Sequence, residues 1–202
     1  MEKINYQKKM EEQISALSGT PSLLLHSCCG PCSSYVLEVL SQHFNVTVLY
    51  FNPNIYPESE YLKRLAEQIK IIDGMPFENP VRLMECAYDE NEFLSAAEGF
   101  ENEREGGARC EKCFRLRMKK TALLAKENDF DFFTTTLSVS PHKNAPLLNK
   151  IGEELSEEYG IKYLYGDFKK KEGYKRSIEL SAQYDLYRQN YCGCRFSLRE
   201  GL

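Results

Sequence analysis

Short apolar runs that alternate with helix-forming segments constrain the fold of this chain most. Runs of this length, most of them nearly continuously apolar, are typical of strands buried on both faces of a parallel sheet. They cover residues 22–27, 46–51, 130–135 and 161–165, with a weaker run at 81–84. Helices are expected at 2–18, from 33 onward, and at 57–73, 89–98, 110–128, 145–159 and 177–187. The alternation predicts an α/β fold in which a largely parallel sheet lies between two layers of helices.

Size and composition favour one domain. The chain has 202 residues, of which 42% are hydrophobic and 28% are charged. We expect a single domain over residues 1–202, with residues 1–20 as a helical extension before the first strand. No apolar run approaches the roughly 18 residues of a membrane span, and the N-terminus lacks a signal-peptide pattern. These features predict a cytoplasmic protein with no membrane partner, whose eight cysteines stay reduced and form no disulfide.

Charge is distributed unevenly along the chain. The net charge is −4, but residues 169–202 carry eight basic and four acidic side chains, so this part is +4 and residues 1–168 are −8. An acidic chain is a poor general binder of nucleic acid, whereas a basic tail suits local contact with phosphates. A solvated surface is the alternative interpretation. We expect residues 166–202 to form a basic C-terminal segment that completes the site described next.

The cysteines are grouped in a way that indicates metal or redox chemistry. Seven of the eight lie in three motifs, Cys28-Cys29-x-x-Cys32, Cys110-x-x-Cys113 and Cys192-Gly-Cys194, and Cys86 is alone. The first motif directly follows the first expected strand, and sites of parallel sheets lie at the carboxyl ends of strands. The phosphate-binding patterns GxxxxGK[ST] and GxGxxG do not occur, so nucleotide binding through such loops is not expected.

Local geometry places four of these cysteines at one centre. Cys29 and Cys32 can face a common point across the Gly30-Pro31 turn, and Cys110 and Cys113 can do the same at the start of a helix. Four thiolates suit zinc or an iron–sulfur cluster. A structural zinc site is therefore one interpretation. A thioredoxin-like redox motif is a weaker one, because it needs only one CxxC pair.

The remaining motif cysteines are expected at a second centre. Cys28 and Cys29 are neighbours in an extended segment, so their side chains should point to opposite sides and not bind the same ion. Cys28 would instead join Cys192 and Cys194 in a three-thiolate site with an open position, as metal catalysis requires. These three are the candidate catalytic ligands. Cys86 is expected to be a core or inert surface residue, and His26 a core histidine.

Polar residues near the expected strand ends are candidates for substrate binding. The stretch TTTLSVSPHKN carries hydroxyls, a histidine and a lysine that suit a polar or anionic substrate. The stretch YDLYRQNYCGC offers aromatic rings and amides that can stack on and hydrogen-bond a base. Ordinary loop and packing roles are the alternatives. The candidates are Ser138, His142, Lys143, Tyr187, Arg188, Asn190 and Tyr191.

Four motifs taken together are similar to the cobalamin-independent epoxyqueuosine reductase family, QueH. They are HSCCGPC, GARCEKCFRLRM, TTTLSVSPHKN and YDLYRQNYCGCRFS, and they occur in the family's order over nearly the whole chain. The resemblance implies a three-layer fold like that of the adenine-nucleotide α-hydrolases, also called HUP-like. It also implies reduction of the epoxide of epoxyqueuosine to the cyclopentene of queuosine, at the wobble position of tRNA.

The resemblance further implies a [4Fe–4S] cluster beside a mononuclear iron, which replace zinc as the expected metals. Divided according to the geometry above, the matching ligands are Cys29, Cys32, Cys110 and Cys113 for the cluster and Cys28, Cys192 and Cys194 for the iron. Some members of the family carry a carboxylate at the position of Cys32. The implied partners are tRNA with epoxyqueuosine at the wobble position and an electron donor of unidentified kind.

Two other functions remain open on the residues alone. One is a zinc-stabilised RNA-binding module that catalyses no reaction. The other is a different tRNA-modifying enzyme of the same fold, such as a sulfur transferase that adenylates its base. That enzyme would need a phosphate-binding loop after the first strand, and the sequence SCCGPC departs from such a loop.

Overall fold

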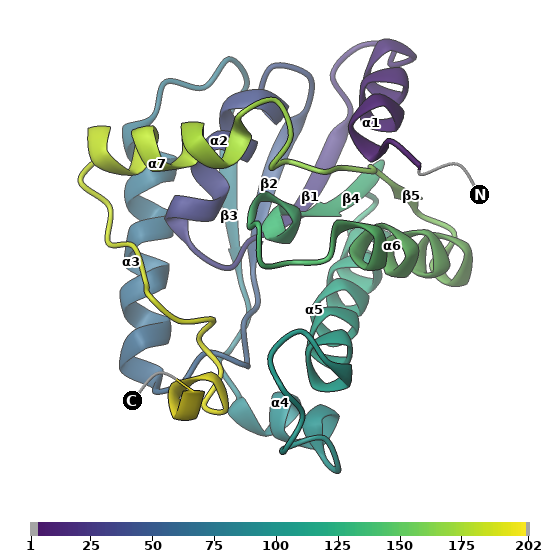
Figure 1. Cartoon of the computed structure of the whole chain (residues 1–202). Coiled ribbons are helices and arrows are strands. Elements are labelled where there is room, and N and C mark those ends of the chain that lie inside the picture. The colour runs from purple at the N-terminus through teal and green to yellow at the C-terminus, as the bar shows by residue number, and fades with distance from the viewer. Residues whose placement is uncertain (1–3, 201–202) are drawn as a thin grey trace.

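Five parallel strands form the centre of the molecule, in the spatial order β3-β2-β1-β4-β5 (Figure 1). The computed structural model describes residues 4–200, so residues 1–3 of the expected N-terminal extension and residues 201–202 of the C-terminal segment lie outside it. The strands are β1 (Ser22–His26), β2 (Asn45–Tyr50), β3 (Val81–Glu85), β4 (Phe132–Thr135) and β5 (Lys162–Tyr163). All the expected strands are present, and β5 is shorter than its pattern predicts.

Helices cover both faces of the sheet, which confirms the expected three-layer α/β fold. One layer contains α1 (Tyr6–Ser15), α2 (Gly30–Leu40), α3 (Glu58–Gly74) and α7 (Gly173–Gln183), and the other contains α5 (Ala108–Glu127) and α6 (Ala145–Tyr159). Helix α4 (Glu90–Ala97) packs against α5, η1 (Thr136–Val139) follows β4, and η2 (Ser197–Glu200) closes the described chain. Within residues 4–200, no helix combines the length and the apolar character needed to cross a bilayer.

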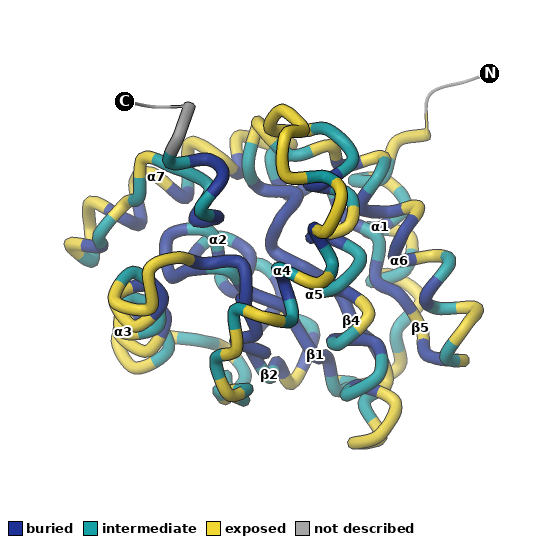
Figure 2. The backbone as a smooth tube through the Cα atoms, turned by 90° about the horizontal axis from the view of Figure 1, so that it is seen from below, coloured by how far each residue is buried: buried dark blue, intermediate teal, exposed yellow. Residues whose placement is uncertain are grey.

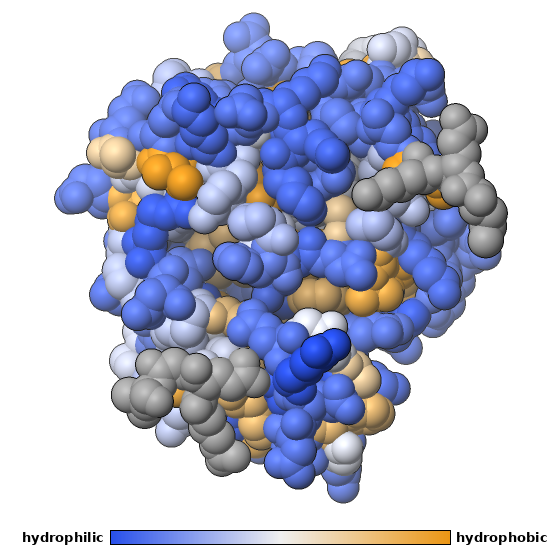
Figure 3. All heavy atoms as spheres, viewed as in Figure 1, coloured by the Kyte–Doolittle hydropathy of each residue, from blue (hydrophilic) through white to orange (hydrophobic). Residues whose placement is uncertain are grey.

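The alternation of side chains along β1 divides the core into two parts. Leu23 and Leu25 pack with Val36 and Leu37 of α2 on one face, whereas Leu24 packs with the helices of the other face. Successive strand side chains point to opposite faces, so a strand covered on both faces needs apolar residues at every position. Exposed residues gather on the outer sides of helices such as α3 (Figure 2). The surface seen in Figure 3 is accordingly mainly hydrophilic.

The chain changes faces between β1 and β4, and this determines where a site can form. Helices α2 and α3 connect the strands on one side of β1, and α5 and α6 belong to the connections on the other side. The carboxyl ends of β1 and β4 lie side by side, with His26 in register with Thr135. Ligands of open parallel sheets bind at such a switch point. The loops after β1 and β4 therefore open on one region.

Helices α2 and α7 begin three or four residues earlier than their sequence patterns predict, and α5 begins two residues earlier. Helix α2 starts at Gly30 rather than residue 33, and Pro31 fits its first turn because a proline lacks the N–H that would be unpaired there. A Cβ atom at Gly30 would lie 2.3 Å from the backbone oxygen of Glu67 in α3, so glycine allows this close approach. Helix α7 starts at Gly173 and ends at Gln183, four residues before the expected end.

Replacing Gly30 by alanine is expected to destabilise the fold, because α2 and α3 must separate to admit the methyl group. Overpacking of this kind costs about 1–3 kcal/mol, and each kcal/mol lowers the melting temperature by about 2–4 °C in a chain of this size. The measurement is thermal unfolding followed by circular dichroism. Gly74→Ala is the matched control, since its Cβ would lie 3.8 Å from the Tyr184 ring, an ordinary contact. Equal melting temperatures for Gly30→Ala and the wild type would contradict this packing.

Candidate metal centre

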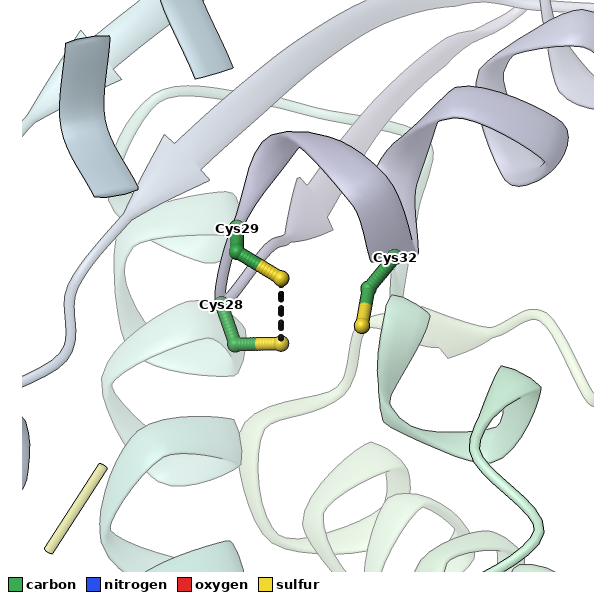
Figure 4. Close-up of side chains that lie close together, drawn as sticks. All are labelled: Cys28, Cys29 and Cys32. Carbon is green, nitrogen blue, oxygen red and sulfur yellow. Dashed lines mark hydrogen bonds between the residues drawn. The ribbon is translucent and has the colours of Figure 1, made fainter. Parts of the chain in front are cut away.

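Three thiols converge in the loop between β1 and α2 (Figure 4). The Sγ atoms of Cys28, Cys29 and Cys32 all lie within 4.8 Å of one another, and those of Cys28 and Cys29 are 3.8 Å apart. A tetrahedral ion with metal–sulfur bonds of about 2.3 Å holds its sulfur ligands about 3.8 Å apart. Hydrogen bonds from Cys29 and Cys32 hold the pKa of Cys28 well below its usual value. These three thiols, called the triad below, are therefore spaced for one metal ion.

The triad corrects the expectation that Cys28 and Cys29 point to opposite sides. Strand β1 ends at His26 and α2 starts at Gly30, so the two cysteines lie in a bend and not in a strand. The alternation of strand side chains does not apply there. The start of the helix brings Cys32 back toward them. Gly30-Pro31 is correspondingly the first turn of α2 and not a separate turn.

Buried hydrogen bonds hold the triad loop to α3 and to the end of β2. The Oε1 atom of Gln68 accepts hydrogen bonds from the hydroxyls of Ser27 (2.6 Å) and Ser33 (2.9 Å). The side-chain amide of Asn52 donates to the carbonyl of Ser27 at 2.8 Å. All four side chains are buried. These hydrogen bonds therefore hold in place the backbone that carries the triad.

His26 is the core histidine that the sequence predicts. Its side chain is fully buried, with Nδ1 3.0 Å from Thr135 Oγ1 and Nε2 3.3 Å from the carbonyl oxygen of Phe51. Burial, aided by the positive charge of Arg117, lowers the pKa of His26 to about 3. The ring is therefore neutral, and it joins the ends of β1, β2 and β4 beneath the triad.

The other motif cysteines form a second, wider group, called the quartet below. Its members are Cys110, Cys113, Cys192 and Cys194. Cys113 and Cys194 are buried in one apolar cluster beside Phe93 of α4. Burial raises the pKa of Cys110, and it raises that of Cys113 to about 11, with the nearby Cys192 and Cys194 adding to both shifts. The quartet thiols thus interact electrostatically, but among the described residues only the triad meets the closer spacing of 4.8 Å.

Arg64 of α3 fixes the C-terminal segment that carries half of the quartet. Its side chain is 1% exposed, and its Nε pairs with Glu60 at 2.7 Å. Its two Nη atoms donate to the carbonyls of Cys192 (3.2 Å) and Tyr191 (3.4 Å). Gly193 has a φ of +111°, and a Cβ there would lie 2.8 Å from Arg64 Nη1. The turn between the two quartet cysteines therefore requires glycine.

Two buried cations lie among the thiols. Lys143 Nζ is 3.0 Å from Cys192 Sγ and 3.6 Å from the Glu105 carboxylate, and its side chain is 11% exposed. Arg117 of α5 is 2% exposed, and its Nε donates to the carbonyl of Cys113 at 3.2 Å. Burial alone would lower the pKa of both cations, but the neighbouring thiolates outweigh it and raise both. Fixed positive charge thus lies beside the sulfur atoms of this site.

Triad, quartet and cations open on one cavity of about 600 Å³. Its walls include Cys28 and Cys32 of the triad, Cys192 of the quartet, and both Arg117 and Lys143. A cavity of this volume can hold a ligand the size of a nucleoside. Cys86 is half-buried and packs against the apolar core on the α5 and α6 side of the sheet, outside both thiol groups.

Five of the seven expected substrate-binding residues line this cavity, namely His142, Lys143, Arg188, Asn190 and Tyr191. The other two do not. Ser138 is buried, and its hydroxyl accepts a hydrogen bond from the backbone N–H of Phe168 at 3.3 Å. The hydroxyl of Tyr187 donates to the Glu60 carboxylate at 3.3 Å, and Lys63 lies over its ring. Membership of a motif did not reveal which way these two side chains point.

Several cavity residues were missing from the predicted site, among them Arg117 and Glu105. Arg117 follows Cys113 by four residues, one helical turn, so the periodicity of α5 could have placed it beside the thiols. Gln189 belongs to the predicted stretch YDLYRQNYCGC, but its contact was not predicted: its Nε2 donates to Cys29 Sγ at 3.1 Å. Glu105 lies in an irregular loop, and it reaches the cavity only through the tertiary fold.

Fold and site together define a class, the parallel α/β proteins with a thiol-rich metal centre at the switch point of the sheet. Two solved structures share the fold. One is a predicted subunit of a tRNA methyltransferase from Methanocaldococcus jannaschii, with a TM-score of 0.50 and 15% identity over 80% of this chain and 76% of that one. The other is the U34-tRNA thiolase NcsA from Methanococcus maripaludis with its [4Fe-4S] cluster, with a TM-score of 0.51 and 11% identity over 94% and 67%. They confirm the expected HUP-like fold.

Sequence comparison identifies the family. The family model described as epoxyqueuosine reductase QueH matches residues 23–200. The epoxyqueuosine reductase QueH of Streptococcus pyogenes serotype M1 is 42% identical over 98% of this chain and 80% of that protein, and that of Thermotoga maritima is 36% identical over 89% and 91%. The chain therefore belongs to the QueH family of epoxyqueuosine reductases. This confirms the expected oxidoreductase activity, the conversion of epoxyqueuosine to queuosine in tRNA.

Arg64→Met is expected to release the C-terminal segment, because it leaves Glu60 and two carbonyls without their cationic partner. Removing one partner of a buried charged network costs about 3–5 kcal/mol. The variant should melt at lower temperature and be cut faster by trypsin after Arg188 and Arg195.

The matched control for this test is Lys70→Met. Lys70 also joins α3 to the C-terminal segment, through Asp185, but it is 45% exposed and such surface pairs contribute about 0–1 kcal/mol. Similar cleavage rates for the two variants would show that Arg64 does not anchor the segment.

Proposed function

We propose that the quartet holds a [4Fe–4S] cluster and the triad holds a single iron, both facing the cavity in which epoxyqueuosine is reduced. The spacing of the thiols carries this proposal. The triad has the short sulfur–sulfur separation of ligands to one ion, whereas a four-iron cluster spreads its thiolates more widely, and no three of the quartet thiols lie within the 4.8 Å of the triad. All seven ligands are sulfur, the donor that iron–sulfur clusters take.

The residues around the thiols fit these groups. A thiolate-ligated iron centre carries net negative charge, and Lys143 and Arg117 place two cations beside it. Cys113 and Cys194 are buried, which protects a cluster from water. The carbonyls of Cys192 and Tyr191 are held by Arg64, so the C-terminal segment completes the quartet. Compared with the division expected from the sequence, this one assigns Cys29 and Cys32 to the single iron. It assigns Cys192 and Cys194 to the cluster.

Epoxide reduction requires electrons, protons and a group that binds the epoxide oxygen. Reduction of an epoxide to an alkene consumes two electrons and two protons and releases water. When bound, a cluster and an adjacent open iron supply single-electron transfer and a Lewis acid for the epoxide oxygen. The protein contributes a cavity that Cys28, Arg117 and Lys143 line together, so a thiol and two cations face the same bound ligand. An electron donor from outside the chain is also needed, and the reduced thiols suit the cytoplasm.

We further propose that the wobble nucleotide enters this cavity from tRNA. Asn190 and Tyr191 offer an amide and an aromatic ring for the base. Arg188 lines the cavity beside Tyr174 and Ser177 of α7, and this side of the cavity is called the α7 end. Lys170 and Lys175, beside this end, are exposed, and no ion pair joins them to another described side chain. They are the cations of the basic segment placed to meet phosphates.

Metal and sulfide content separates the two possible ligand divisions. Protein purified without oxygen should hold about five irons and four sulfides per chain. The double variant Cys29→Ala/Cys32→Ala should lose about one iron and keep its sulfide, whereas Cys192→Ala/Cys194→Ala should lose the sulfide. Cys86→Ala should match the wild type.

The opposite pattern, with sulfide lost only from the Cys29/Cys32 variant, would restore the division expected from strand alternation. One zinc and no sulfide in the anaerobic wild type would instead support a zinc-stabilised RNA-binding module.

Binding of tRNA should weaken as salt rises, because phosphate contacts release counterions. Lys170→Ser/Lys175→Ser should lower the affinity and reduce the slope of log affinity against log salt by about 1–2. The control Lys119→Ser/Lys126→Ser removes the same charge from α5. An equal loss in both variants would assign the effect to net charge and not to contact by this segment.

A further inference from the structure

Arg117 combines deep burial with unused hydrogen-bonding capacity. Its side chain is 2% exposed and lines the cavity between the triad and the quartet. Its Nε donates to the Cys113 carbonyl at 3.2 Å. Its Nη atoms make no hydrogen bond to an oxygen of another residue in the described part of the chain, and no carboxylate there pairs with the guanidinium, whose side-chain neighbour is the Cys113 thiol. Of the five N–H donors of an arginine, at least three therefore remain for a ligand.

Such an arrangement is costly unless a ligand uses it. A buried charged group without partners destabilises a fold unless water or a ligand reaches it, and the guanidinium of Arg117 opens on the cavity, where a ligand can. The sulfur atoms of Cys28, Cys113 and Cys192 lie close enough to Arg117 to interact with its charge. They are also the ligands assigned to the iron groups, where a hydrogen bond to sulfur would tune the metal group and still leave other N–H donors unused. The donors thus remain available to whatever enters the cavity.

We propose that Arg117 is a catalytic residue whose guanidinium donates hydrogen bonds to the epoxide oxygen of the substrate. The proposal rests on the function proposed above, which brings that oxygen to the triad. Arg117 lies beside Cys28 of the triad, whereas the cations suited to phosphates, Lys170, Lys175 and Arg188, are exposed. Because Arg117 is buried, it is better placed to bind the reacting oxygen of the substrate than to bind the phosphates of the RNA.

The chemistry of the oxygen explains why arginine suits this position. Negative charge develops on the oxygen as a C–O bond breaks, and fixed donors stabilise that charge more than they stabilise the neutral epoxide. Arginine remains protonated throughout and presents two parallel donors. Lys143, the other buried cation, is already engaged with Cys192 and Glu105. The guanidinium of Arg117 is accordingly the cationic donor that remains available to the epoxide oxygen.

Kinetics of fully loaded variants test the proposal. Iron and sulfide are measured first, and kcat is expressed per loaded chain. Arg117→Lys keeps the charge but loses the forked donors, and it should lower kcat by about 10²–10³ with a smaller change in KM. Arg117→Ala should show a similar loss that millimolar guanidinium partly restores and equal ammonium does not. Arg115→Lys is the control on the same helix, where Arg115 is 39% exposed and pairs with Glu154.

A binding measurement provides a readout apart from turnover. Hairpin RNAs that carry either epoxyqueuosine or queuosine differ only in the oxygen that Arg117 would hold. The oxidised wild-type enzyme should bind the epoxide hairpin several-fold more tightly, and Arg117→Lys should lose this preference while binding the queuosine hairpin as before.

Two results would overturn the proposal. Full kcat in Arg117→Lys would mean that only the positive charge matters. Loss of iron or sulfide in proportion to activity, with no guanidinium rescue, would make Arg117 a structural support of the quartet. Failure of the ligand assignment is seen separately, in the metal content of the cysteine variants.

Discussion

The register between β1 and β4 is the constraint on which the site depends. Pairing of His26 with Thr135 brings the two carboxyl ends of these strands together at the point where the chain changes faces. The loop after β1 carries the triad, and the segment after β4 carries Lys143. Helix α5, which precedes β4, contributes Cys110, Cys113 and Arg117 from the other layer. A slip of one residue would separate these groups, because it would invert every side chain of the strand.

Charge balance is the second requirement of such a site. Seven thiols near one cavity cannot all ionise without positive charge close by, because burial opposes each thiolate. Burial raises the pKa of Cys113 to about 11, and the nearby cation Arg117 counters that shift. Arg64 acts on the backbone, where its donors hold the turn between Cys192 and Cys194 in place. The cations Arg117 and Lys143 thus supply the positive charge that this group of thiols requires.

Local patterns in the sequence predicted much of the fold, and tertiary contacts determined what they missed. The apolar runs located all five strands, and motif spacing located the seven thiols. Strand alternation failed at Cys28 and Cys29 because the strand ends two residues earlier. Ser138 and Tyr187 belong to the right motifs, but they turn toward Phe168 and Glu60. Gln189 reaches Cys29 across 160 positions of sequence, a contact that only the folded chain creates.

The most direct test of this account is a crystal structure of anaerobically prepared protein with anomalous diffraction at the iron edge. The account predicts one isolated iron bonded to Cys28, Cys29 and Cys32, and a separate group of four irons bonded to Cys110, Cys113, Cys192 and Cys194. Four irons bonded to Cys29, Cys32, Cys110 and Cys113, with a lone iron on the remaining cysteines, would contradict it.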